Sequence, residues 1–239
     1  CWSLRDAKPC YVPAAYCIAN TPFDDHKYSL YHHNGNSAGN TCEEAILQGL
    51  LEVIERDAVA VWWYNQIPRP AIDFSVIPTE QRASIAGSLC DWNYWLLDIS
   101  HDIDAVSCVA VGQHKESKGF ALGFGCHIEP GIACARALTE MYQLIQIKDQ
   151  VTGPFDFEHM EALPYLFPKR GTAAKTQQDF SFFQRDHEDR RSIEGETASL
   201  VQNLARQGFD TCIADYSRPW LPLKTLKVIV PGLCHFWPQ

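Results

Sequence analysis

The sequence has no apolar run long enough to cross a bilayer, and its composition, 46% hydrophobic and 21% charged, is typical of a soluble globular chain. We therefore expect no membrane association and a cytoplasmic location. Basic residues are also scarce, since 20 Lys and Arg face 29 Asp and Glu and give a net charge of -9. This balance disfavours nucleic acid as a partner, and any bound nucleotide would need local basic residues or metal ions.

The sequence also lacks the cysteine spacing of a disulfide scaffold or a zinc site. Its 10 cysteines are scattered, none forms a C-x-x-C pair, and no signal peptide precedes them. We expect reduced cytoplasmic thiols. The pairs Cys126-His127 and Cys234-His235 are adjacent residues, which rarely ligate one metal ion, so structural zinc is disfavoured.

The order of the expected elements predicts the fold class. The 239 residues suit one domain without repeats or a linker. We expect helices at 43–63, 78–90, 130–148 and 191–207, and strands at 94–100, 106–113, 119–128, 209–216 and 223–230. The segment 150–190, with several prolines and mixed charges, is expected to be a long mobile loop. Helices and hairpin strands segregated in this way predict an α+β fold, with a mixed, largely antiparallel sheet packed against helices.

The helix at 43–63 has an unusual distribution of polar residues. At 3.6 residues per turn its polar stripe covers about a third of the circumference. The stripe consists of Glu44, Gln48, Glu52, Glu55 and Arg56. The rest is almost entirely apolar, so we expect the helix to be buried on most sides and the stripe to line a cleft. Asp57 falls on the apolar side, where its charge needs a partner, and we expect a structural role for it.

Two carboxylates of this stripe have the spacing of a metal site. Glu52 and Glu55, at positions i and i+3, can converge on one point, as oxygen ligands of magnesium do. Arg56 adds a fork that fits phosphate. The alternative is a solvated face with an ion pair between Glu52 and Arg56, worth about 0.3–0.5 kcal/mol. Spacing alone leaves both interpretations open.

The helix at 130–148 repeats the pattern. Arg136, Glu140 and Gln143 share one face, and apolar residues occupy the opposite face. An i,i+4 salt bridge is again the alternative. Because the sequence has no P-loop and no G-x-G-x-x-G motif, two such faces favour a nucleotide site built from side chains.

The stretch at 34–70, NGNSAGNTCEEAILQGLLEVIERDAVAVWWYNQIPRP, resembles the signature of YcaO-domain proteins. It is most similar to the ATP-dependent cyclodehydratases of thiazole/oxazole-modified peptides. Further similar stretches are WSLRD and VPAAY near the start, ALTEMYQ at 137–143, LPYLFP at 163–168 and VIVPGLCHFWP at 228–238. The resemblance covers essentially the whole chain, which looks like the carboxy-terminal part of a YcaO domain.

The resemblance implies roles for the polar residues. In the family the E-x-x-E-R element supplies magnesium carboxylates, here Glu52 and Glu55, and a phosphate-contacting arginine, here Arg56. A family helix that faces ATP matches the segment with Arg136, and the two arginines are the implied catalytic residues. The implied ATP-binding set is Asn40, Glu44, Gln48, Glu52, Glu55, Arg56, Arg136, Glu140 and Gln143.

The resemblance also implies a reaction. A Cys, Ser or Thr side chain of a ribosomal precursor peptide attacks the preceding amide carbonyl, ATP phosphorylates the oxyanion, and phosphate leaves to give an azoline ring. Implied partners are the precursor peptide, a leader-peptide-binding protein or domain, and a second copy in a homodimer. Two alternatives stay open: thioamide or amidine formation by a YcaO enzyme, and a non-catalytic peptide-binding or scaffold role.

Some family features have no match in the chain. These are a Gly-Lys-Gly stretch, an S-A-x-x-E-x-x-E-R helix and a P-x-P-x-P tail, and Trp220 in YSRPWLPLKT replaces an acidic position. We therefore expect the isolated chain to hydrolyse no ATP, because ligands for phosphate and metal are missing from it.

Overall fold

The computed structural model describes residues 1–23, 27, 29, 31–86, 89–147, 160–184 and 192–236. The chain divides into two compact units, which are described separately. Unit 1 comprises Cys1–Val53 and His187–Leu233, and unit 2 comprises Ile54–Asp186 and Cys234–Gln239. Both contain antiparallel sheets and helices, so the predicted α+β class is confirmed.

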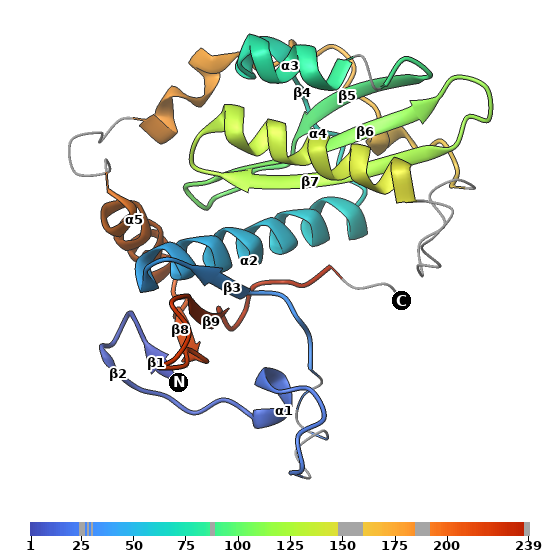
Figure 1. The fold of residues 1–239 in the computed structure, drawn as a ribbon. Helices are drawn as coiled ribbons and strands as arrows, with labels where there is room; N and C mark the ends of the chain where they lie inside the picture. Colours follow the sequence, from blue (N-terminus) through green and yellow to red (C-terminus); the bar gives the residue numbers. More distant parts are fainter. Residues whose placement is uncertain are drawn as a thin grey trace. The chain divides into compact units, whose positions relative to one another are not determined.

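Unit 1 is built on a five-stranded sheet with the order β2-β1-β8-β9-β3, and every neighbouring pair is antiparallel (Figure 1). The strands are β1 (Trp2–Ser3), β2 (Lys8–Pro9), β3 (Asn36–Gly39), β8 (Cys212–Asp215) and β9 (Lys224–Ile229). Its helices are α1 (Ala14–Cys17), α5 (Ile193–Arg206) and the first half of α2 (Cys42–Tyr64). A Cβ at Gly49 of α2 would lie 2.8 Å from the Val228 side chain, so the helix packs directly on β9.

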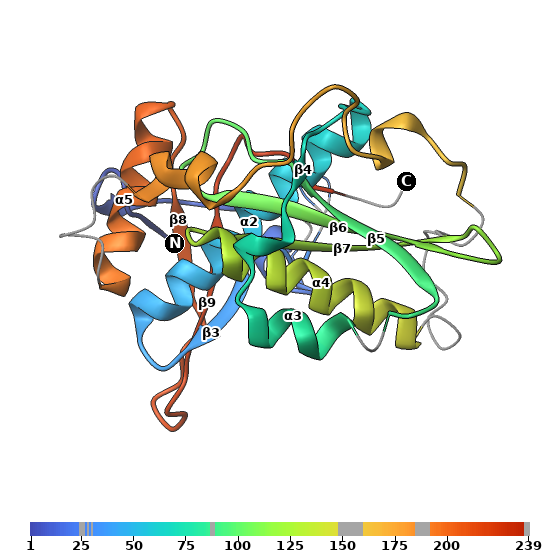
Figure 2. The same ribbon diagram turned by 90° about the horizontal axis from the view of Figure 1, so that it is seen from above.

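Unit 2 is built on a four-stranded sheet with the order β4-β5-β6-β7 (Figure 2). The strands are β4 (Ala71–Ile72), β5 (Trp92–Asp98), β6 (Val106–His114) and β7 (Phe120–His127). The helices are η1 (Phe74–Val76), α3 (Thr79–Ala86), α4 (Pro130–Ile147), η3 (Pro164–Leu166), η4 (Gln177–Gln184) and the second half of α2. β7 is an edge strand of this sheet.

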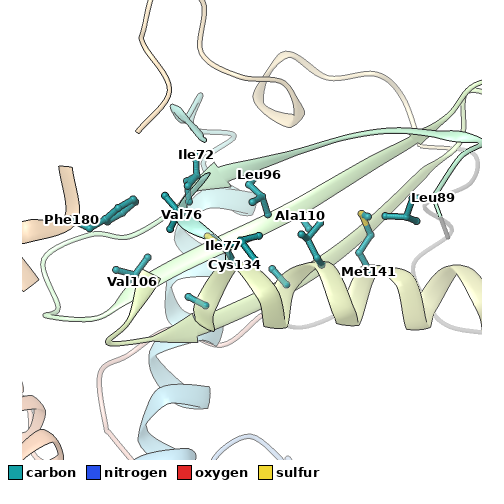
Figure 3. Packing of buried hydrophobic residues seen from close by; sticks show 14 of the residues in the cluster. Ile72, Val76, Ile77, Leu89, Leu96, Val106, Ala110, Cys134, Met141 and Phe180 are labelled. Atoms are coloured by element: carbon teal, nitrogen blue, oxygen red, sulfur yellow. The ribbon is translucent and has the colours of Figure 1, made fainter. Parts of the chain in front are cut away.

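Alternating side chains of this sheet form two cores, because successive residues of a strand point to opposite faces. On one face Leu96, Val106 and Ala110 pack against α4 through Cys134 and Met141 (Figure 3). The opposite face carries Leu97, Val109 and Leu122, which pack against Ala58, Val59 and Trp62 of α2. The second half of α2 and the helix α4 therefore cover opposite faces of one sheet.

Most expected elements are confirmed. The helices predicted at 43–63, 78–90, 130–148 and 191–207 are α2, α3, α4 and α5, and the predicted hairpin at 106–128 is β6 and β7. β3 was not predicted, because the polar residues NSAG do not alternate with apolar ones. Within the expected loop at 150–190, residues 150–159 and 185–190 lie outside the described residues, and the described part holds η3, η4 and the buried Phe180.

Within the described ranges, no helix combines the length and the apolar character needed to cross a membrane. All ten cysteines are free thiols.

Candidate functional site

The first turn of α2 is closed by its own polar residues. Thr41 is the N-cap, since its hydroxyl oxygen accepts the Glu44 backbone N–H at 3.2 Å. Glu44 Oε2 accepts both the backbone N–H of Asn40 at 2.8 Å and its side-chain amide at 3.0 Å. These bonds give Asn40 and Glu44 a capping function at the start of α2, and they hold the Glu44 side chain against Asn40.

The middle of the stripe lies along the part of α2 that belongs to unit 1. Gln48 and Glu52 are half-buried. Glu52 Oε2 accepts the backbone N–H of Gly35 at 3.1 Å. Gly35 can make this contact because it is a glycine with φ +81, and a Cβ there would lie 2.1 Å from the carbonyl oxygen of Val228. The loop before β3 thus supplies a backbone donor to the stripe.

Glu55 and Arg56 continue the stripe in unit 2. Arg56 Nη2 lies 3.5 Å from Glu55 Oε1, and the two side chains keep only 23% and 13% of their exposure. Arg56 Nε is buried and has no hydrogen-bond partner among the described residues. Among the described residues, Arg56 pairs with Glu55 and not with Glu52, so the ion pair expected as the alternative does not form. A buried guanidinium with an unused donor is a natural anion ligand.

The helix α4 approaches β7 very closely, because two glycines leave room for its backbone. A Cβ at Gly123 would lie 2.2 Å from the carbonyl oxygen of Ala137, and one at Gly125 would lie 2.2 Å from that of Ala133. Alternating glycines in a strand often mark such an approach. The contact brings the polar face of α4 to the free edge of β7.

Two predicted site residues bind this edge. Arg136 Nη1 donates to the carbonyl oxygen of Cys126 at 3.3 Å, and Glu140 Oε2 accepts the backbone N–H of Phe124 at 2.5 Å. Both backbone groups belong to an edge strand, and no other described strand pairs with that side. Arg136 is exposed and Glu140 half-buried, while Gln143, one turn further, is exposed.

Electrostatic effects connect α2 with this edge. Burial raises the pKa of the Cys126 thiol to about 12, the Glu55 carboxylate adds to the rise, and the Arg136 guanidinium opposes it. Burial, and then Arg136, lower the pKa of His127 to about 4. Arg136 thus contacts the Cys126 backbone and also acts on its thiol, whereas the effect of Glu55 is electrostatic.

Asp57 has the structural role expected for it. It is buried, and Oδ1 accepts the backbone N–H of Cys234 at 2.6 Å. His101 Nε2 lies 2.9 Å from Asp57 Oδ2, and His101 Nδ1 lies 2.7 Å from Asp102 Oδ1. Burial disfavours the charged imidazole, but the two carboxylates outweigh it and raise the pKa of His101. Asp57 therefore holds the backbone of Cys234 in place within unit 2.

The described carboxylates of α2 are of the type that magnesium accepts as ligands. The described ranges contain no group of three or more His, Cys, Asp or Glu that could hold a metal. Magnesium is usually held by one or two carboxylates together with phosphate oxygens and water, so such a group is not required. The half-buried carboxylates of Glu52, in unit 1, and of Glu55, in unit 2, are groups of this kind. The Nε of Arg56 is a donor that suits a phosphate oxygen instead.

Sequence reasoning missed the backbone groups of this site. The N–H of Gly35 and Phe124 and the carbonyl of Cys126 have no signature of their own. The glycines at 123 and 125 were the available signal, since they permit the approach of α4.

Known proteins share the sequence pattern and the fold of this chain. A family model described as YcaO cyclodehydratase, ATP- and Mg2+-binding, matches residues 1–234. A solved heterocyclase in complex with substrate and cofactor is 34% identical with a TM-score of 0.85, over 99% of this chain and 33% of that one. YcaO from Methanopyrus kandleri, bound with AMPPCP and Mg2+, is 26% identical with a TM-score of 0.79, over 97% of this chain and 63% of that one.

An uncharacterized protein of Methanothermobacter thermautotrophicus is 30% identical over 219 residues, which are 84% of this chain and 55% of that protein. The chain thus spans between about a third and two thirds of the length of these three relatives.

Proposed function

Because the chain belongs to the YcaO cyclodehydratase family, we propose that it is part of an enzyme that uses ATP and Mg2+ to activate peptide amides. The amide oxygen of a ribosomal precursor peptide is phosphorylated after attack by a Cys, Ser or Thr side chain, and loss of phosphate gives an azoline ring. The observation that carries this proposal is the attachment of the polar face of α4 to the free edge of β7, where Arg136 bonds the carbonyl of Cys126 and Glu140 bonds the N–H of Phe124.

The proposed roles follow from the chemistry of each side chain. ATP supplies the phosphoryl group and Mg2+ offsets its charge. Glu52 and Glu55 are the proposed magnesium carboxylates, and Arg56 and Arg136 stabilise the negative charge that develops on the transferred group. The proposed nucleotide ligands are Asn40, Glu44, Gln48, Glu140 and Gln143.

The geometry of unit 2 supports the roles of two of these residues. The Nε of Arg56 is enclosed without a partner, so an anion beside it would satisfy a group that is otherwise costly to bury. Glu140 is held in one orientation by the N–H of Phe124, which keeps its carboxylate beside Arg136 on the same helix face. Side chains fixed in this way lose little freedom when a ligand binds.

We propose the same partners as the family resemblance implies. They are the ribosomal precursor peptide, a leader-peptide-binding protein or domain, and a second copy of the chain, and we propose a cytoplasmic location. The whole protein, rather than these residues alone, is proposed to carry the activity.

The test uses the full-length enzyme with its precursor peptide. Phosphate release and peptide mass are measured together, and azoline formation predicts the loss of one water per ring. Arg136→Lys loses the fork of the guanidinium and is expected to lower the rate about 10²-fold. Arg170→Lys is the matched control, since Arg170 is exposed in unit 2 and has no proposed role.

Three results would contradict the proposal. Phosphate release without Mg2+ would contradict the role of the metal, and equal rates for the two arginine variants would contradict the role of Arg136. A peptide product that carries a thioamide or amidine would rule out azoline formation. Binding of peptide with no ATP hydrolysis at all would favour the scaffold role.

A further inference from the structure

Lys227 in unit 1 is a buried ammonium group that the proposed roles do not use. It lies on β9, it is fully buried, and Nζ donates a hydrogen bond to the carbonyl oxygen of His32. The rings of Tyr16 and Tyr31 enclose it, with centroids 5.1 Å and 5.3 Å from Nζ. No ion pair between described residues includes Lys227, and its direct contacts are a carbonyl and two aromatic faces.

Such an enclosed charge is costly, which makes its presence informative. Burial lowers the pKa of Lys227, and the carboxylate of Glu52 and the thiol of Cys17 act in the opposite direction. An apolar side chain of similar length would fill the same space without the desolvation cost. The ammonium group therefore has a task that a hydrophobic residue cannot perform, and the hydrogen bond to His32 indicates which one.

The carbonyl of His32 begins a turn that β9 holds at both ends. The backbone N–H of Val228, next to Lys227, donates to the carbonyl of Gly35 at 2.8 Å, and the turn is closed by Asn36 N–H on the His33 carbonyl at 3.0 Å. We call residues 32–36 the clamped turn. Lys227 fixes its beginning and Val228 fixes its end.

The clamped turn determines where one backbone donor points. The N–H of Gly35 donates to Glu52 Oε2 at 3.1 Å. An ionised carboxylate has several acceptor positions, so one N–H orients it without using up its capacity to bind a cation. The chain of contacts therefore runs from Lys227 through the turn to Glu52, and all of it lies within unit 1.

We propose that Lys227 is a positioning residue for Glu52: its ammonium group holds the clamped turn, and the turn fixes the carboxylate in the orientation that binds Mg2+. This inference rests on the proposed function, because it takes Glu52 as a magnesium ligand. Groups that orient a metal ligand typically contribute about 10–100-fold to metal affinity.

The experiment compares Lys227→Met with Lys175→Met in the full-length protein. Lys175 is a matched control in unit 2, since its Nζ contacts Asp98 and lies 5.4 Å from the Phe180 ring centroid. Mn2+ affinity is measured by electron paramagnetic resonance with a non-hydrolysable ATP analogue, and hydrogen exchange is followed at Gly35. We expect Lys227→Met to weaken Mn2+ binding about tenfold or more and to speed exchange at Gly35. Lys175→Met should change neither, and Lys227→Arg should restore most of the affinity.

The double variant separates positioning from general damage. If Lys227 acts through Glu52, then Lys227→Met added to Glu52→Gln should weaken Mn2+ binding no further. Unchanged Mn2+ affinity in Lys227→Met, or full additivity in the double variant, would overturn the inference even if exchange at Gly35 were faster. Should Lys227→Met fail to fold, Lys227→Gln is measured in the same way.

The two proposals fail in different ways. If the unmodified protein binds no Mn2+ with the nucleotide, the proposed function fails and the inference about Lys227 fails with it. If the unmodified protein binds Mn2+ and the Lys227 variants bind it equally well, only the inference about Lys227 is wrong.

Discussion

Gly125→Ala should move α4 away from β7 and thereby disturb the site. The new Cβ would lie 2.2 Å from the carbonyl oxygen of Ala133, more than 1 Å inside ordinary contact, and 3.1 Å from the Cβ of Arg136. Backbone cannot yield as a flexible side chain does, so the helix must shift. Overpacking of this kind costs about 1–3 kcal/mol. For a chain of this size that corresponds to a Tm lower by about 5 °C.

The effect on activity should exceed the effect on stability. A shift of about 1 Å in the position of a group that contacts the transition state costs up to about 10²-fold in rate. The Cβ of Arg136 would lie 3.1 Å from the new methyl group. The hydrogen bond from Arg136 to the carbonyl of Cys126 should therefore be among the first to break. Thermal unfolding by circular dichroism and phosphate release by the full-length enzyme at 25 °C measure the two effects separately.

Gly112→Ala is the matched control for this prediction. A Cβ at Gly112 also points at α4, but it would meet the side chains of Met141 and Trp92, both at 3.1 Å, and a thioether can move aside. We expect a Tm change of no more than about 2 °C and little change in rate. If Gly125→Ala matched this control in both measurements, the close approach of α4 would not be what holds the site together.

Three further predictions concern other charged groups. Asp57→Ala should destabilise the protein by about 3–5 kcal/mol in urea unfolding, because it leaves buried partners unpaired, and a loss below about 1 kcal/mol would contradict this role. Imidazole NMR titrations should place His127 near pH 4 and His101 above its ordinary value. Because folding lowers the pKa of His127, its contribution to stability should decline as the pH falls below about 6.5. Because folding raises the pKa of His101, its contribution should be complete below about pH 6.5 and should decline as the pH rises through the folded pKa. Reversed midpoints would refute both assignments. Glu140→Gln keeps an oxygen that can accept the N–H of Phe124, so the free energy of unfolding should change by only about 1 kcal/mol. ATP affinity, measured by calorimetry, should fall at least about tenfold because the charge is lost. An unchanged affinity would show that Glu140 does not bind the nucleotide.

Periodicity predicted the helices that carry the site but not the groups they meet. The polar stripe of α2 and its burial on the remaining sides follow from positions 3.6 residues apart, and the structure confirms both. The position of Asp57 on the apolar side of the helix predicted that it has a partner. It did not predict that the partner is the backbone of Cys234, because no local sequence pattern links two residues so far apart in the chain.

Backbone partners were beyond prediction for a related reason. Every residue carries the same N–H and carbonyl groups, so the choice of Gly35, Phe124 and Cys126 depends on which strand is at an edge and which loop lies beside α2. These are tertiary properties. The resemblance to a family supplied the functional roles, whereas spacing alone slightly favoured an ion pair on a solvated face.

The bonds that Arg136 and Glu140 make to β7 have a second consequence, for solubility. Unpaired backbone groups at the border of a sheet invite another chain to add a strand, and charged side chains over that border prevent it. The residues expected to hold the nucleotide thus also prevent another chain from adding a strand to the free edge of β7. Neutralising both at once should produce oligomers or precipitate, and a loss of turnover in such a variant would need size-exclusion chromatography before it could be attributed to chemistry.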